Sequence, residues 1–167
     1  MEHYMTKRTF LGAGAAALGA LITGCSREGG AAPAETFEVN RSPEEWRKIL
    51  SPEQFAVLRE ENTERAGSSS LNAEHRRGIY ACAGCALPVY RSDAKFESGT
   101  GWPSFTAPIE GAVRTRPDRG LFGARTEVHC RRCGGHLGHV FDDGPPPTGK
   151  RYCMNGIAMT FTPAQQS

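Results

Sequence analysis

Apolar residues at helical spacing mark the start of the folded part of the chain. Ile49 and Leu50 follow Trp46 at intervals of three and four residues, so the three share one helix face that we expect to be buried. The stretch SPEEW at 42–46 supplies a capping serine, a proline for the first turn and the glutamate of a capping box. The pattern therefore predicts a short helix with Trp46 in the core.

A second short helix is predicted directly afterwards, because the same cap signature recurs as SPEQ at 51–54. Phe55 and Leu58 form its inward stripe, with Phe55 in the core. Residues 62–77 are polar, with three consecutive serines, and are predicted to form a surface loop.

Beyond this loop the pattern changes to short apolar segments bounded by turn residues, which is typical of β structure. The segments are 88–90, 120–123 and the alternating stretch TEVH at 126–129. Twenty glycines and eleven prolines in 167 residues also favour a turn-rich β protein over a helical bundle. The sequence therefore predicts one mainly β domain at 41–167.

The N-terminal region has the pattern of an export signal. Lys7 and Arg8 precede an uncharged run at 9–23 that is too short and too glycine-rich to span a bilayer comfortably. The run ends in LITGC, which resembles the lipobox of bacterial lipoproteins, with Cys25 as the lipidated residue. Residues 1–24 are thus expected to be a signal peptide. Lys7 replaces the first arginine of a twin-arginine signal, which leaves the export route open, and an uncleaved anchor helix is the alternative.

The next stretch, 25–40, is rich in Gly, Ala, Pro and Glu and has little to bury. It is expected to be a flexible tether with a reach on the order of 20 Å. This organisation predicts a membrane-anchored exported lipoprotein whose domain works outside the cytoplasm, on the periplasmic side. The formal charge of +2, without a basic patch that contains aromatic residues, does not favour nucleic acid as a partner.

Four of the six cysteines form two CxxC pairs, CAGC at 82–85 (knuckle 1) and CRRC at 130–133 (knuckle 2). The two-residue gap lets both sulfurs of a pair face one metal ion, and four thiolates match a closed tetrahedral zinc site. Structural Zn²⁺ is therefore predicted on Cys82, Cys85, Cys130 and Cys133. Two disulfides or a redox-active CxxC are the alternatives, and an exported location favours the oxidation of thiols.

The remaining cysteine beyond the lipobox, Cys153, lies in RYCMN at 151–155. The thiolate is the nucleophilic form of cysteine, and a nearby cation favours it. Arg151 is two residues away, so on a strand it projects from the same face. A buried structural cysteine fits this pentapeptide equally well.

Two further stretches contain candidate chemistry. SGTGWPSF at 98–105 places Trp102 on a rigid loop, where its indole either plugs the core or walls a small apolar pocket. HLGHVFDDG at 136–144 directly follows knuckle 2. His136 and His139 are therefore rigidly mounted candidates for ligands, acids or bases, with simple surface residues as the alternative.

These motifs, in this order, resemble those of the peptide-methionine (R)-S-oxide reductases, the methionine sulfoxide reductase B family. The likeness covers roughly residues 42–163. It implies a mainly β fold of two antiparallel sheets with two short N-terminal helices and, often, a structural zinc site on the knuckles. It also implies reduction of the R epimer of methionine sulfoxide in oxidised proteins or peptides, with an external thiol or thioredoxin-like protein as reductant.

The resemblance assigns catalytic roles by motif position. Cys153 would attack the sulfoxide sulfur and become a sulfenic acid. His139, with His136 beside it, would protonate or hydrogen-bond the sulfoxide oxygen, because oxygen leaves sulfur poorly until it is protonated. Arg151 would favour the thiolate, and Asn155 would help to order the site.

The substrate-binding roles follow in the same way. The S-methyl group would lie against Trp102 and Phe141. Asp142 and Asp143 would orient their loop and its histidine. Thr100 stands where many family members carry the cysteine that resolves the sulfenic acid, so an external reductant is expected to do so here. A catalytically inactive zinc-ribbon binding module and a thiol–disulfide oxidoreductase that uses the CxxC pairs are the alternative functions.

Overall fold

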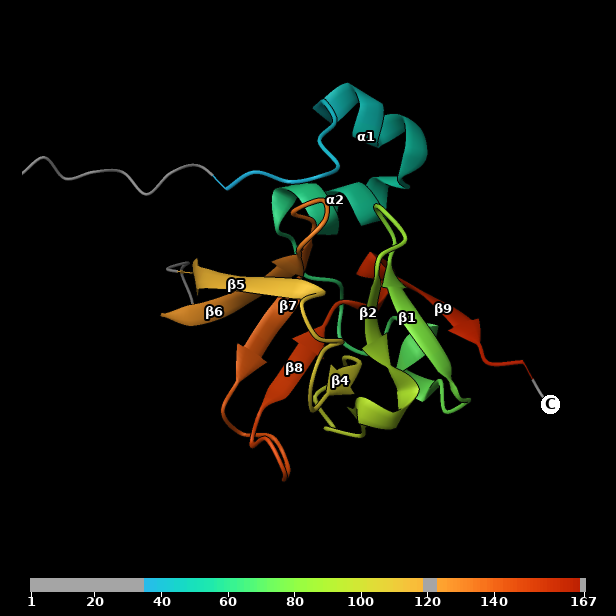
Figure 1. Ribbon diagram of the computed structural model, residues 1–167, viewed down its shortest axis with the longest axis vertical. Helices are drawn as coiled ribbons and strands as arrows, with labels where there is room; N and C mark the ends of the chain where they lie inside the picture. Colours follow the sequence, from blue (N-terminus) through green and yellow to red (C-terminus); the bar gives the residue numbers. More distant parts are fainter. Residues whose placement is uncertain (1–34, 119–122, 166–167) are drawn as a thin grey trace, which may run out of the picture. The chain divides into compact units, whose positions relative to one another are not determined.

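Two antiparallel β-sheets form the body of the computed structural model, which describes residues 35–118 and 123–165 (Figure 1). The three-stranded sheet has the order β2-β1-β9, with β1 at Gly78–Cys82, β2 at Pro88–Arg91 and β9 at Met159–Pro163. The six-stranded sheet has the order β3-β4-β8-β7-β6-β5. Its strands are β3 Lys95–Phe96, β4 Ser104–Phe105, β5 Val113–Asp118, β6 Arg125–Cys130, β7 His136–Phe141 and β8 Arg151–Met154. The predicted mainly β fold of two antiparallel sheets is confirmed.

Several sequence predictions lie outside the described residues. These are the signal peptide at 1–24, the lipidated Cys25, the tether as far as residue 34, and the segment at 120–123 except Gly123. Among the residues that are described, no helix has the length and apolar content needed to cross a membrane.

The two predicted helices are confirmed as α1, Pro43–Ile49, and α2, Pro52–Glu60. Each begins with a complete capping box, in which Ser42 and Ser51 accept hydrogen bonds from the backbone N–H groups three residues later. The predicted burial of Ile49 is wrong, because this side chain is 54% exposed. The helix α1 has only seven residues, so its buried stripe is confined to Trp46 and the capping residue Leu50, one turn apart.

The core lies between the two sheets and is built on three aromatic rings. Tyr80 of β1 and Tyr90 of β2 belong to the three-stranded sheet, whereas Phe105 of β4 belongs to the six-stranded sheet. Phe105 stacks on Tyr90 at a centroid distance of 4.3 Å and meets Tyr80 edge-on at 5.0 Å. All three rings are fully buried, so they join the sheets through large apolar contacts.

The helices pack against the two knuckles, at one end of the sheets (Figure 1). Trp46 of α1 lies against Gly84 of knuckle 1, whereas Leu58 of α2 lies against Gly135, just after knuckle 2. A Cβ atom at Gly135 would lie 2.9 Å from a Leu58 methyl group, so any larger residue there would force the buried Leu58 side chain to shift. Helix packing therefore fixes the loops that carry the four cysteines.

Part of the predicted tether is bound to the domain. The Val39 N–H donates to the Arg132 carbonyl at 2.9 Å, and the Phe37 ring meets the edge of His129 at 5.9 Å. This segment covers one face of β6, which explains why the predicted alternation at 126–129 fails. Residues 127–130 are all buried, because Val128 and Cys130 belong to the core, whereas on the other face Glu35 and Phe37 contact His129, and Arg116 and His136 contact Glu127.

Candidate active site and metal centre

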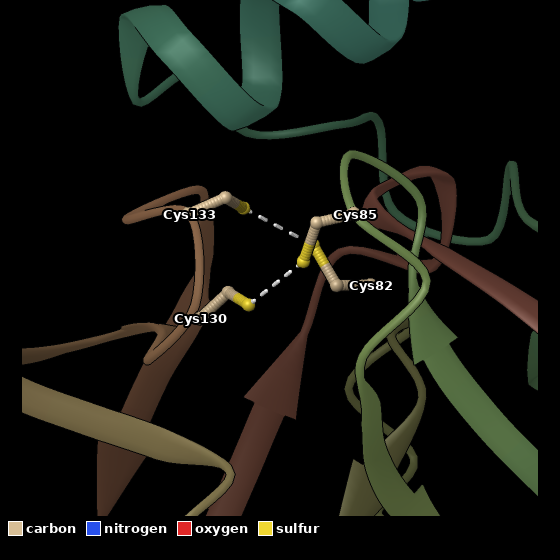
Figure 2. A group of neighbouring side chains, drawn as sticks. All are labelled: Cys82, Cys85, Cys130 and Cys133. Atoms are coloured by element: carbon tan, nitrogen blue, oxygen red, sulfur yellow. Dashed lines mark hydrogen bonds between the residues drawn. The ribbon is translucent and has the colours of Figure 1, made fainter. Parts of the chain in front are cut away.

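The four knuckle cysteines converge on one point between the two sheets (Figure 2). Cys82 Sγ lies 3.7 Å from Cys133 Sγ, and Cys85 Sγ lies 3.5 Å from Cys130 Sγ. All four sulfurs lie within 4.8 Å of one another. The strands between the knuckles thus return the chain to its starting point, as the spacing predicted.

The geometry of this cluster fits a tetrahedral metal ion. Metal–sulfur bonds of about 2.3 Å place sulfurs at tetrahedral corners roughly 3.8 Å apart, close to the two observed pair distances. Cys82, Cys130 and Cys133 are fully buried and Cys85 is partly buried, so the site is closed to solvent on most sides. Hydrogen bonds with neighbouring thiols, first that with Cys130, and burial raise the pKa of Cys82. A bound cation would remove this penalty by favouring four thiolates.

Cys153 and His139 lie directly opposite each other on neighbouring strands β8 and β7. Glu127 of β6 is opposite His139, and Ser104 of β4 is opposite Cys153 on the other side. Residues directly opposite in antiparallel strands project from the same face of a sheet. The register therefore arranges Ser104, Cys153, His139 and Glu127 in one row across four strands.

A pocket of about 120 Å³ opens at the centre of this row. The predicted residues Cys153, His139, Trp102, Phe141 and Asn155 all line it. Gly138, Thr63 and Arg125 complete the lining. A larger groove of about 1050 Å³ lies between α2, the loop at 62–71 and β9. It contains neither Cys153 nor a histidine, so the smaller pocket is the candidate active site.

The partner of His139 comes from β5 and not from the loop that contains Asp142 and Asp143. Its Nε2 atom lies 2.8 Å from Asp118 Oδ2, at the end of β5. Burial lowers the pKa of His139, although the hydrogen bond to Asp118 acts in the opposite direction. The predicted orientation of this histidine by Asp142 or Asp143 is wrong, because these carboxylates pair with Lys150 and Arg151.

His136 lies behind His139 rather than in the pocket. Its ring is 2% exposed and its centroid is 5.2 Å from that of His139. His136 Nδ1 is 2.9 Å from a carboxylate oxygen of Glu127, which also pairs with Arg116. His136 therefore packs against His139 from the interior and does not line the pocket.

Arg151 is fixed beside the pocket by two contacts. Its guanidinium group donates to Asp143 through Nε at 2.9 Å and Nη2 at 2.8 Å, and it lies 4.4 Å above the Phe141 ring. Hydrogen bonding to Asp143 raises the pKa of Arg151, and the nearby Cys153 sulfur acts in the same direction. Arg151 thus places a permanent positive charge next to Cys153.

Thr100, which stands where many relatives carry the resolving cysteine, lies beside Cys153. Its hydroxyl oxygen lies 3.8 Å from Cys153 Sγ and 2.8 Å from Ser98 Oγ. Ser98 Oγ is in turn 2.7 Å from Ser104 Oγ, and the Ser104 hydroxyl donates to the Trp102 carbonyl. The hydroxyl groups of Thr100, Ser98 and Ser104 therefore form a chain of contacts from Cys153 Sγ to the Trp102 carbonyl.

Sequence reasoning missed four residues of this region: Thr63, Asp118, Arg125 and Glu64. Thr63 and Arg125 line the pocket, Asp118 holds His139, and Glu64 accepts the Trp102 indole N–H through its carbonyl. Thr63 and Glu64 lie in a polar loop without a local motif. The other two lie at the ends of β5 and β6, where only the sheet register brings them to the pocket.

The fold and the pocket define a class of proteins. Its members are β domains of two sheets, with one cysteine in a pocket and four other cysteines in a separate cluster. Comparison with known families gives the particular member of this class. A SelR domain model matches residues 50–163. The peptide methionine sulfoxide reductase MsrB of Methanosarcina barkeri is 53% identical over 124 residues, 74% of this chain and 87% of that protein.

A second relative, the peptide methionine sulfoxide reductase MsrB of Bradyrhizobium diazoefficiens, is 54% identical over 127 residues. The match covers 75% of this chain and 91% of that protein. The MsrB of Leptospira interrogans is 48% identical over 126 residues, 75% of this chain and 96% of that protein. The chain therefore belongs to the SelR or methionine sulfoxide reductase B family, and it is an oxidoreductase of that family.

Proposed function

We propose that the protein reduces peptide-bound methionine (R)-sulfoxide to methionine through Cys153. The observation that carries the proposal is the direct pairing of Cys153 with His139 across β8 and β7, inside a pocket with an aromatic wall. The family relationship supports the reaction, and the pocket supports the assignment of residues to it.

In the first step, the Cys153 thiolate attacks the sulfoxide sulfur while the oxygen takes up a proton. His139 is the proposed donor, because it lies opposite Cys153 and its ring is held by Asp118. This attack forms a bond between the two sulfurs. The hydroxyl group then passes from the substrate sulfur to the Cys153 sulfur, which breaks the sulfur–oxygen bond of the substrate, and the sulfur–sulfur bond breaks as methionine leaves. Thiol plus sulfoxide thus gives sulfenic acid plus thioether, so atoms and electrons balance.

The remaining pocket residues have supporting roles in this proposal. Arg151 stabilises the thiolate by charge. Trp102 and Phe141 provide the apolar wall for the S-methyl group. Asn155 orders the wall, since its amide donates to the Leu137 carbonyl and accepts from the Glu64 N–H. His136 supports His139 through ring contact.

The second step requires an external reductant in this proposal. Two thiol groups, from a small thiol or a thioredoxin-like protein, reduce the sulfenic acid to the thiol, and they leave as a disulfide plus water. Thr100 supports this route, because a hydroxyl group lies beside Cys153 where many relatives carry a resolving cysteine. The other described cysteines, Cys82, Cys85, Cys130 and Cys133, are gathered in the metal cluster.

The knuckle cluster is proposed to hold structural Zn²⁺. Four sulfurs near tetrahedral spacing fill every coordination position, so the metal would fix the two knuckles and leave no position for substrate. The location is also a proposal. The lipobox ending at Cys25 and the apolar run before it support an exported lipoprotein that is anchored to a membrane by lipid, with its domain on the periplasmic side.

The decisive test compares the wild type with Cys153→Ser on peptides that contain the separated R and S epimers of methionine sulfoxide. We expect reduction of the R epimer by the wild type and none by the variant. Activity on the S epimer alone would refute the assignment. A metal-bound protein without activity on either epimer, and with an unreactive Cys153, would favour the binding-module alternative.

A further inference from the structure

Glu64 makes four hydrogen bonds that connect separate walls of the pocket. Its N–H donates to Asn155 Oδ1 at 2.9 Å, and its carbonyl accepts from Trp102 Nε1 at 3.1 Å. Its carboxylate accepts from the Gly156 N–H at 2.6 Å and from the Ile157 N–H at 2.9 Å. One residue of a polar loop thus reaches the indole, the amide side chain and the backbone that follows β8.

Three of these bonds fix groups that follow or precede the strands, namely the Trp102 indole and the backbone of Gly156 and Ile157. Trp102 precedes β4 and lies on a loop, so its indole orientation depends on the partner of its N–H group. Gly156 and Ile157 follow Asn155 directly, so the carboxylate anchors the chain two and three residues beyond β8. The two hydrogen bonds to the Glu64 carboxylate are charge-assisted, and such bonds are stronger than neutral ones.

The surroundings leave little space for another arrangement. A Cβ atom added to Gly156 would lie 2.0 Å from Ser69 Oγ and 3.3 Å from Glu64 Oε1. The Gly67 N–H also donates to the Gly101 carbonyl at 2.7 Å, next to Trp102. The loop at 64–69 is therefore packed on both the tryptophan loop and the turn after β8.

We propose that Glu64 is a positioning residue for sulfoxide reduction: its carboxylate ties its own backbone to the turn after β8, and that backbone in turn holds Trp102 and Asn155 in place around Cys153. The proposal rests on the functions proposed above for these pocket residues. Glu64 does not line the pocket, so it acts through its partners and does not contact the substrate. Its role is geometric: it sets the distance between the apolar wall and the reacting sulfur.

The test uses Glu64→Gln, which keeps the size of the side chain but turns one acceptor oxygen into an N–H donor that faces a backbone N–H. We expect the kcat/KM for a methionine (R)-sulfoxide peptide to fall about tenfold or more. Alkylation of Cys153 by iodoacetamide needs no pocket wall, so its rate is expected to stay within about twofold of the wild type. Glu53→Gln is the matched control, because Glu53 lines the neighbouring groove and its carboxylate accepts a hydrogen bond from the Ser51 hydroxyl group, away from Trp102 and Asn155.

A double-mutant cycle with Trp102→Phe, which removes the indole N–H, tests the connection itself. If Glu64 acts through Trp102, the double variant loses clearly less than the product of the two single losses. Hydrogen exchange of the Trp102 indole N–H, followed by NMR in Glu64→Gln, is expected to accelerate about tenfold or more. This readout does not depend on catalysis.

Three results would overturn the proposal: unchanged kcat/KM, equal losses of kcat/KM and alkylation rate, or multiplicative losses in the cycle. Failure of the proposed function gives a different result, namely sulfoxide reduction by Cys153→Ser. In that case the indole exchange experiment still reports whether Glu64 positions Trp102.

Discussion

His139 and Cys153 are direct partners in the β7–β8 ladder, so hydrogen-bonded strands, and not a loop, set the distance between the proposed acid and the proposed nucleophile. Side chains on strands are positioned more tightly than those on loops, which suits a reaction that needs a thiolate and a proton donor together.

Replacement of His139 by alanine is expected to lower kcat for the R-sulfoxide by roughly 100-fold or more, because the oxygen loses its proton donor. Steady-state kinetics with peptide substrate measure this loss. His75→Ala is the control, since the His75 side chain is 70% exposed and lies on the surface. Equal kinetics for the two variants would argue against His139 as the acid.

Replacement of Thr100 by cysteine is expected to create an internal disulfide with Cys153 during turnover. The Thr100 hydroxyl oxygen lies 3.8 Å from Cys153 Sγ, so a thiol at this position has the attacking sulfur within reach. Mass spectrometry after one equivalent of sulfoxide measures the bond. Thr160→Cys, on the other sheet, serves as the control and is expected to leave Cys153 as a sulfenic acid. Absence of a disulfide in Thr100→Cys would contradict the expected geometry.

Metal content is expected to depend on the knuckle cysteines and not on the pocket cysteine Cys153. Cys130→Ser breaks the four-thiolate set, so it is expected to lose the metal and to lower the melting temperature by several degrees or more. Cys153→Ser is expected to retain one metal per chain and the wild-type melting temperature. Elemental analysis and calorimetry measure both quantities. Full metal occupancy in Cys130→Ser would show that another donor set is used.

Alkaline pH is expected to destabilise the fold through its core tyrosines. Burial, followed by the charge of Glu74, raises the pKa of Tyr80 to about 12, and burial also raises that of Tyr90. Unfolded tyrosine ionises near pH 10, so above this pH the unfolded chain holds fewer protons than the folded one. The stability that these groups contribute is therefore complete below about pH 10 and is lost as the pH rises through about 12.

Urea unfolding at about pH 9 and about pH 11 measures this loss as a change in the free energy of unfolding. Tyr80→Phe removes one ionising group and is expected to make the curve flatter over the same range. A variant with the same pH dependence as the wild type would indicate that other groups cause the alkaline loss.

Local signals in the sequence predicted the elements well, because caps, turns and CxxC pairs are encoded within a few residues. Ser42 and Ser51 begin helices as predicted, and the knuckles meet as their spacing indicated. The predicted pocket residues Trp102 and Asn155 line one cavity. Ile49 was misplaced because helical periodicity does not report that a seven-residue helix buries only a narrow stripe.

The partners of the site could not be predicted in the same way. Asp118 reaches His139 across 21 positions, and Glu64 reaches Gly156 across 92. No local pattern encodes such contacts, since they depend on sheet order and on the path of a polar loop. Asp142 and Asp143 are close to the histidines in the sequence, yet in the structure they form ion pairs with Lys150 and Arg151.

The strand order also determines when the protein can become reactive. β4 pairs with β8 although Ser104 and Cys153, which lie opposite each other, are 49 positions apart in the sequence. Contacts of such separation cost more loop-closure entropy than the nearby pairing of His139 with Cys153, so we expect β4 to join β8 after β7 does. A partly folded chain therefore carries Cys153 without Thr100 and Trp102 beside it, and its thiol has no substrate pocket. Completion of the six-stranded sheet is therefore expected to be a condition for the proposed chemistry.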